Sequence, residues 1–161
     1  MPFKISCLLF AKDLDSKLLL MKRNKSPNKG LWSPPGGKLE MESGESPFEC
    51  AKREAQEEMN LNLDDHDLHL FGYVSEKNYE GGSHWLMFLF EILPNLTMIP
   101  EEINEGQFKF FDRNEIDTLE IPPSDHKLVW PIFDKRKKGF WGIRANFDNM
   151  STKIMIEAEP K

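Results

Sequence analysis

The sequence is poor in three features that would point to particular classes of protein. Only two cysteines, Cys7 and Cys50, occur among its 161 residues. A disulfide framework is therefore not indicated, and a reducing compartment, the cytoplasm, is expected. No run approaches the roughly 18 uninterrupted apolar residues of a membrane helix, so we expect neither a span nor a membrane partner. The formal net charge of −6 argues against a broad basic surface for a nucleic-acid polymer.

The composition is that of a folded protein. Hydrophobic residues make up 39% of the chain and aromatic residues 11%, which favours a globular protein over a disordered one. The length suffices for one domain with a core and is short for two. We therefore predict a single domain over residues 1–148 and a C-terminal tail, 149–161, in which no packing pattern is visible.

Short apolar runs alternate with turn residues along the chain. They predict strands over residues 3–11, 17–21, 31–33, 69–75, 84–93, 107–111 and 139–147. The first two should form a hairpin. A short helix is expected within 112–119, and a last helix over 124–135 that Pro131 would end or kink. Strands on both sides of a central helix predict an α/β fold with a mixed β-sheet sandwiched between α-helices.

The central helix is predicted from the stretch SPFECAKREAQEEMNL, residues 46–61. Ser46 is a good N-cap, Pro47 suits the first helical position, and Glu49 completes a capping box. Asn60 is expected to end the helix in the left-handed conformation. One stripe of side chains should face the core: Phe48, Ala51, Ala55 and Met59.

Three glutamates late in this helix, Glu54, Glu57 and Glu58, are unfavourable when considered alone. Like charges at these spacings repel by about 0.2–0.5 kcal/mol per pair, and anions near a helix C-terminus oppose its dipole. They could form a solvated charged face. They could also chelate a hard divalent cation such as Mg²⁺, which takes oxygen ligands and is often shared with substrate phosphates. The second interpretation also explains why the charges are tolerated.

The preceding loop favours the cation. GLWSPPGGKLEMESGES followed by REAQEEMNL resembles the signature of the MutT-like Nudix hydrolases. That signature is Gly, five residues, Glu, seven residues, then Arg-Glu-hydrophobic-x-Glu-Glu-x-Gly-hydrophobic. Glu45 and the run from Arg53 to Glu58 match it in spacing. The chain departs from it twice, because seven residues separate Gly37 from Glu45 and because Asn60 replaces the final glycine.

The resemblance implies the Nudix fold and the hydrolysis of a nucleoside diphosphate linked to another group, X. The cofactor would be Mg²⁺, with Mn²⁺ as a substitute, and the partner a small nucleotide. Glu54, Glu57, Glu58 and the Gly37 carbonyl would bind the metal, while Glu45 would pair with Arg53 and fix the loop against the helix. Bound metal neutralises the diphosphate and activates water. The general base would be Glu54 or an acid of a later loop, where we favour Glu105 over Glu102 and Glu101.

For the substrate we expect phosphate contacts from Arg23 and Lys38, the cations that flank the signature. A base could stack on one of several aromatic residues: Phe3, Tyr79, Trp85 or Trp130. The compact length fits family members that convert nucleoside triphosphates, including oxidised purine forms of the 8-oxo-dGTP type, to a nucleoside monophosphate and pyrophosphate.

Other substrates and other classes remain as alternatives. Tyr79 lies eighteen residues past Leu61, near the position of a tyrosine in dinucleoside polyphosphate hydrolases. An ADP-ribose or nucleotide-sugar hydrolase is a further alternative, but ADP-ribose hydrolases tend to have a proline where Ser75–Lys77 stand here. A non-catalytic Nudix binding module is disfavoured by the intact acids, and an isopentenyl diphosphate isomerase relative by the positions of Cys7 and Cys50. A homodimer is compatible with the sequence.

Overall fold

The computed structural model describes residues 3–26, 28–79, 82–147 and 152–161. The strands are β1 Phe3–Phe10, β2 Leu18–Arg23, β3 Trp32–Ser33, β4 Gly36–Lys38, β5 Leu68–Tyr79, β6 Ser83–Ile92, β7 Gly106–Phe111, β8 Trp141–Asn146 and β9 Lys153–Ala158. The helices are α1 Pro47–Met59, α2 Arg113–Ile116, α3 Asp125–Leu128 and α4 Trp130–Asp134, with single 3₁₀ turns at Asp65–Asp67 and Arg136–Lys138. None of the helices in these ranges is both long and apolar enough to cross a membrane.

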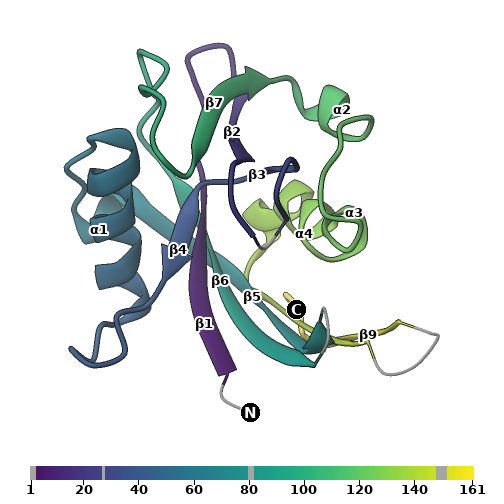
Figure 1. Ribbon diagram of the computed structural model, residues 1–161. Coiled ribbons are helices and arrows are strands. Elements are labelled where there is room, and N and C mark those ends of the chain that lie inside the picture. Colours follow the sequence, from purple (N-terminus) through teal and green to yellow (C-terminus); the bar gives the residue numbers. More distant parts are fainter. Residues whose placement is uncertain (1–2, 27, 80–81, 148–151) are drawn as a thin grey trace.

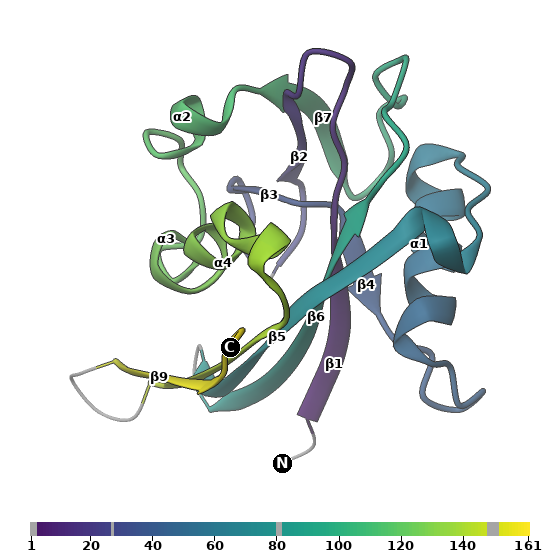
Figure 2. The same cartoon turned by 180° about the vertical axis from the view of Figure 1, so that it is seen from behind.

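The strands form two sheets. The larger has six strands in the order β4-β1-β6-β5-β8-β9, and the smaller has the order β3-β2-β7. In the larger sheet β1 runs parallel to β6 and β5 parallel to β8, while the remaining neighbours are antiparallel. Helix α1 covers one face of this sheet and α3 with α4 lie on the other, as both views show (Figures 1 and 2). The predicted α/β fold with a mixed sheet between helices is confirmed.

Two apolar clusters fill the space on the two sides of the larger sheet. Alternation along β6 separates them, because Phe90 belongs to the cluster under α1 and Leu89 to the cluster under α3 and α4. The second cluster contains fully buried aromatic rings, including Phe10 against Trp130 at 5.4 Å between ring centroids. The apolar stripe predicted for α1 points into the first cluster. Apolar packing thus covers both faces of the larger sheet.

The ends of α1 follow the local sequence signals. Ser46 Oγ accepts a hydrogen bond from the Glu49 backbone N–H, and the Glu49 carboxylate accepts one from the Ser46 N–H, each at 3.1 Å. Asn60 takes the left-handed conformation, with φ 54° and ψ 40°. These contacts satisfy backbone groups that a helix end leaves unpaired, so the helix boundaries predicted from the sequence are confirmed.

Some elements differ from the expectation because they depend on tertiary pairing. Strands β1 and β2 are joined by a turn and pair through a bridge between Lys12 and Leu18. Beyond this bridge they separate into different sheets, so only the part of the predicted hairpin next to the turn forms. Strand β4 arises within the turn-rich glycine segment, where a Cβ on Gly36 would collide with the Cys7 backbone carbonyl. The predicted last helix is broken into α3 and α4 at Val129, since Pro131 cannot donate a backbone hydrogen bond.

The C-terminal tail predicted for residues 149–161 contains a strand at residues 153–158, while 149–151 lie outside the described residues. This strand, β9, pairs antiparallel with β8 from Asn146↔Lys153 to Gly142↔Ala158. The strand was missed because its side chains do not alternate between buried and exposed, so no packing pattern marks it. The domain boundary itself stays a prediction.

The left-handed C-terminus of α1 gives a first prediction. We expect Asn60→Ala to lower the free energy of unfolding by about 1 kcal/mol, because a Cβ-bearing residue other than Asn is strained there. Asn60→Gly should leave stability nearly unchanged, since glycine adopts this conformation freely. Urea denaturation measures both, and equal losses in the two variants would contradict the assignment.

Candidate functional site

Arg53 is the centre of the polar contacts made by α1. Its guanidinium donates to both carboxylate oxygens of Glu45, at 2.6 and 2.9 Å, and to the backbone carbonyl of Lys38 at 3.0 Å. It also donates to Glu54 at 2.8 Å and to Glu57 at 3.1 Å. Bidentate contacts of this kind are the strong form of an arginine–carboxylate pair. One side chain therefore joins the loop, β4 and the acidic face of the helix.

Glu54 and Glu58 lie against β4. A Cβ on Gly37 would collide with the carboxylate of Glu54, and the Gly36 N–H donates to Glu58 Oε2 at 3.2 Å. Both glutamates are buried. Burial raises the pKa of Glu54, and burial together with the charge of Glu54 raises the pKa of Glu58 to about 8. The Arg53 guanidinium offsets only part of the cost of charging this pair, because the pKa of Glu54 stays raised beside it.

Glu57 lies apart from this pair, with a side chain that is 58% exposed and in contact with Arg53. Across the described ranges, no three His, Cys, Asp or Glu side chains are close enough together to form a metal site. The structure therefore brings Gly37, Glu54 and Glu58 together and leaves Glu57 at the rim. The proposed ligand set of Gly37, Glu54, Glu57 and Glu58 stays a prediction.

A cavity of about 500 Å³ opens beside the end of α1. Glu57 and Glu58 line one side of it, and the segment of residues 95–103, with Glu101 and Glu102, lines the other. Glu105 follows this segment and is exposed. Its negative charge contributes to the raised pKa of Glu58. Two acids of the loop thus face the acidic helix across this cavity, and the charge of the third, Glu105, acts on Glu58.

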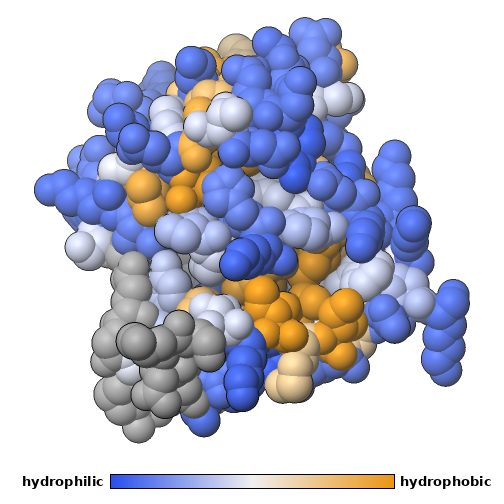
Figure 3. Space-filling model, turned by 90° about the vertical axis from the view of Figure 1, so that its right-hand side faces the viewer, coloured by the Kyte–Doolittle hydropathy of each residue, from blue (hydrophilic) through white to orange (hydrophobic). Residues whose placement is uncertain are grey.

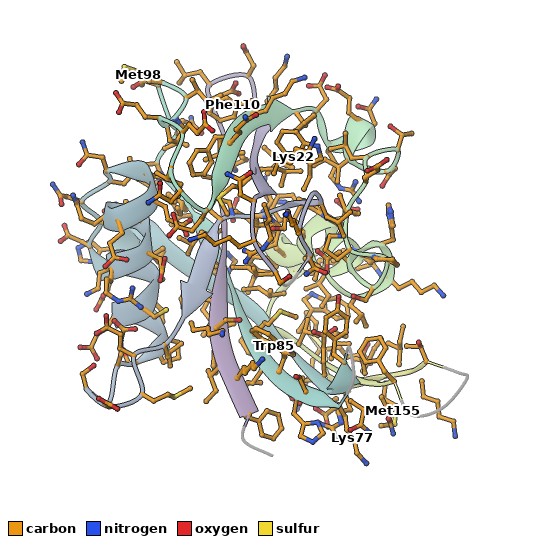
Figure 4. All side chains as sticks on the ribbon, viewed as in Figure 1. Lys22, Lys77, Trp85, Met98, Phe110 and Met155 are labelled. Carbon is orange, nitrogen blue, oxygen red and sulfur yellow. The ribbon has the colours of Figure 1, made fainter. Side chains whose placement is uncertain are left out.

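A second cavity, of about 130 Å³, lies on the other side of β4. Gly36, Gly37 and Lys38 form part of its wall. Three side chains predicted to contact substrate, Arg23, Lys38 and Tyr79, line it together with Trp85. Figure 4 shows Trp85 on the side of the sheet away from α1. We refer to this space as the β4 cavity.

Two acids of the β4 cavity were missed by the sequence interpretation. Glu76, on β5, and Asp125, at the start of α3, are both buried and both line it. Burial and the neighbouring charge of Glu76 raise the pKa of Asp125 to about 8. Asp125 has polar neighbours in the sequence, Ser124, His126 and Lys127, so no sequence signal distinguished it, and nothing in the sequence places it near Glu76.

The stacking candidates separate into two groups. Tyr79 and Trp85 line the β4 cavity, and the Tyr79 hydroxyl donates to Asn28 Oδ1 at 3.1 Å. Trp130 is buried in the core under α3 and α4, and neither it nor Phe3, which is 47% exposed beside His84, belongs to the cavity wall. Core packing explains Trp130. The ammonium of Lys38 lies 5.7 Å from the centre of the Trp85 ring.

Comparison with known proteins identifies relatives over most of the chain. The sequence model of the NUDIX domain matches residues 2–131. An uncharacterized Nudix hydrolase, YvcI, from Bacillus subtilis is 33% identical over 116 residues, covering 71% of this chain and 70% of that protein. An ADP-ribose pyrophosphatase from Methanocaldococcus jannaschii is 28% identical over 127 residues, 78% of this chain and 70% of that protein.

The fold is also found among solved structures. A mutator MutT protein from Bacillus halodurans superposes with a TM-score of 0.72, covering 98% of this chain and 99% of that chain at 24% identity. At that identity the likeness concerns the fold.

The contact between Glu45 and Arg53 gives a prediction for acid stability. The hydrogen bond from Arg53 lowers the pKa of Glu45 in the folded protein, so its stabilisation is complete above the unfolded pKa of about 4.3 and is lost as pH falls through the folded pKa. We expect Glu45→Gln to cost about 1 kcal/mol at pH 7 and to lose less further stability on acidification than the wild type. Urea midpoints measured from pH 7 to 3 test this.

Glu42→Gln is the matched control, since Glu42 is an exposed acid of the same loop. Its stability should follow the wild-type curve. Parallel pH curves for the wild type and Glu45→Gln would rule out this role for Glu45.

Proposed function

The chain belongs to the Nudix hydrolase family, whose members act on phosphoric anhydride bonds and use divalent cations, and we propose that it is a Mg²⁺-dependent pyrophosphohydrolase of nucleoside triphosphates. One observation carries the proposal. Strand β4 separates the buried carboxylates of Glu54 and Glu58 from a cavity lined by cations, aromatic rings and two acids. A nucleotide bound across β4 would have its base on one side and its phosphates at the acidic helix.

The donors around Gly37 are of the chemical kind that holds a hard cation, and Glu57 would have to leave Arg53 to join Glu54 and Glu58. We assign the metal to Glu54, Glu57, Glu58 and the Gly37 carbonyl, which are all oxygen donors of the kind that Mg²⁺ prefers. The raised pKa values of Glu54 and Glu58 support this, because a cation would offset the cost of keeping both acids charged. When bound, the metal would neutralise phosphate charge and acidify a water molecule.

The protein's own groups then orient the reaction. Arg53 holds Glu54 in place and fixes the Glu45 loop against α1, so we regard Arg53 and Glu45 as positioning residues. Water attacks a phosphorus atom, the bond to the leaving pyrophosphate breaks, and a carboxylate takes the proton of the water. Glu105 is the base that we favour, with Glu54 as the alternative. Arg23 and Lys38 would contact the phosphates at the mouth of the β4 cavity.

Asp125 and Glu76 support an oxidised or 6-oxo purine as the base. With its pKa raised to about 8, Asp125 is protonated at neutral pH and can donate a hydrogen bond, while the carboxylate oxygens of Glu76 can accept one. A purine edge that carries both a carbonyl and an N–H matches such a pair. Tyr79 and Trp85 would flank the base. The products would be a nucleoside monophosphate and pyrophosphate.

Two other substrates have specific support. The relative from Methanocaldococcus jannaschii is named an ADP-ribose pyrophosphatase, and the position of Tyr79 in the cavity suits a dinucleoside polyphosphate.

The alternative of an isopentenyl diphosphate isomerase relative has less support. The sulfur atoms of Cys7 and Cys50 are buried and 3.2 Å apart, and this contact raises the pKa of Cys50, which makes it a poor nucleophile.

The metal assignment predicts the outcome of an activity assay. Release of the nucleoside monophosphate would be measured with Mg²⁺ over nucleoside triphosphates, oxidised dNTPs, dinucleoside polyphosphates and ADP-ribose. We expect turnover to require the cation and to fall at least about 100-fold in the Glu57→Gln, Glu58→Gln double variant, because lost ligands weaken metal binding. Glu120→Gln, which changes an exposed acid elsewhere, should keep wild-type turnover. An active double variant would refute the ligand set.

The acid pair predicts a pH effect on KM. Asp125 donates only while protonated, so KM for the preferred nucleotide should rise as pH increases through about 8. Asp125→Asn keeps a donor at every pH and should remove this rise. Asp125→Leu should raise KM by about 5- to 150-fold at pH 7 with little change in kcat, the cost of one lost hydrogen bond. A KM in Asp125→Asn that still rises above pH 8 would assign the effect to another group.

A further inference from the structure

Strand β9 forms one outer edge of the six-stranded sheet. It pairs with β8 on its inner side, and within the residues that the structure describes no strand pairs with its outer side. Figures 1 and 2 show it projecting from the body of the molecule. An open edge presents a row of backbone N–H and C=O groups that can pair with another strand. This strand also lies outside residues 2–131, which the family model matches.

The side chains of β9 leave this edge open and apolar. Ile154 is 40% exposed, and Met155 and Ile156 are each 56% exposed. Figure 3 looks onto the side toward which β9 projects and shows apolar surface in its lower half. Single exposed apolar residues are ordinary, but edge strands are commonly protected by proline or by a charge within the strand. Neither interrupts this run of three, and the irregularity in the pairing of β9 with β8 comes after it, at Glu157.

Two of these residues extend the core. Ile156 is opposite Ile143 on β8, and Ile154 is opposite Ala145. Both partners on β8 are buried in the cluster under α3 and α4. Because alternate side chains of a strand share a face, Ile154 and Ile156 continue that apolar surface to the edge of the sheet, where it ends uncovered.

We propose that β9 pairs antiparallel with β9 of a second copy of this chain, with Met155 on the two-fold axis. The sequence Lys-Ile-Met-Ile-Glu, residues 153–157, is symmetric in character about its centre. In this register Ile154 is opposite Ile156 of the second copy, and Lys153 is opposite Glu157. Each interface would thus hold two pairs of isoleucines and two pairs of opposite charge, and opposed pairs are what stabilises adjoining strands.

Other registers lose this complementarity. A shift by one residue would place Lys153 opposite an isoleucine, and a shift by two would place Glu157 opposite Met155. The side chains of β9 therefore complement those of a second β9 in one register only, which favours a second copy of this chain over an unrelated segment. The interface involves a single strand from each copy, so it belongs to the small class that gives weak, concentration-dependent association.

Charge exchange tests the register by sedimentation velocity over a concentration series. Lys153→Glu and Glu157→Lys should each weaken dimerisation by about 3- to 30-fold, because both place like charges opposite each other. The double variant Lys153→Glu, Glu157→Lys should recover wild-type association. Tyr73→Phe is the matched control, since the Tyr73 hydroxyl donates to Glu157 at 3.0 Å within one chain, and it should leave dimerisation unchanged.

Crosslinking tests the position of the axis. Met155 lies on the outer strand (Figure 4), and Met155→Cys should form a disulfide between copies under the mild oxidant diamide, because it would be opposite itself. Ile154→Cys should crosslink far less, and Ile154→Cys, Ile156→Cys should crosslink again. The wild type controls for Cys7 and Cys50, both buried.

Several results would overturn the proposal. These are a protein that stays monomeric at high micromolar concentration, a dimer indifferent to the single charge variants, a double variant that fails to recover, and crosslinking as strong through Ile154→Cys as through Met155→Cys.

Discussion

The arrangement around α1 depends on the contacts of one guanidinium. Arg53 joins the Glu45 loop, the Lys38 backbone and Glu54, and the bond from the Gly36 N–H to Glu58 adds a second link between β4 and the helix. A lysine could not replace it, because an ammonium is a single charge without the planar fork that meets two carboxylate oxygens. With this link in place, the loop after β4 is fixed against the helix, and the position of β4 determines where the acids lie.

Strand β4 connects the two halves of the candidate site. Its glycines let the backbone approach Cys7 on one side and the carboxylate of Glu54 on the other, and any larger residue would push these elements apart. The close approach explains why Glu54 and Glu58 are buried and why their pKa values are raised. The three residues of β4, Gly36, Gly37 and Lys38, also form part of the wall of the β4 cavity. The position of the β4 backbone therefore both buries Glu54 and Glu58 and forms part of the wall of the β4 cavity.

The sequence predicted features that are encoded locally. The capping box at Ser46, the left-handed Asn60 and the break near Pro131 depend on neighbouring residues only, and all were predicted correctly. The separation of β1 from β2, the formation of β4 and β9, and the meeting of Glu76 with Asp125 depend on partners far away in the chain. Only the resemblance to a known signature supplied the Glu45–Arg53 contact, since no periodic pattern relates a loop residue to a helix residue eight positions later.

The walls of the β4 cavity come from several elements, and α1 is not one of them. Glu76 and Trp85 lie on β5 and β6, and Asp125 begins α3, whereas the acids assigned to the metal lie on α1. Substitutions in the walls outside β4 can therefore change which molecule is bound without altering the residues assigned to bond cleavage. In evolutionary terms the two functions are separable, so relatives with the same helix can diverge in substrate through a few changes on the opposite side of the sheet.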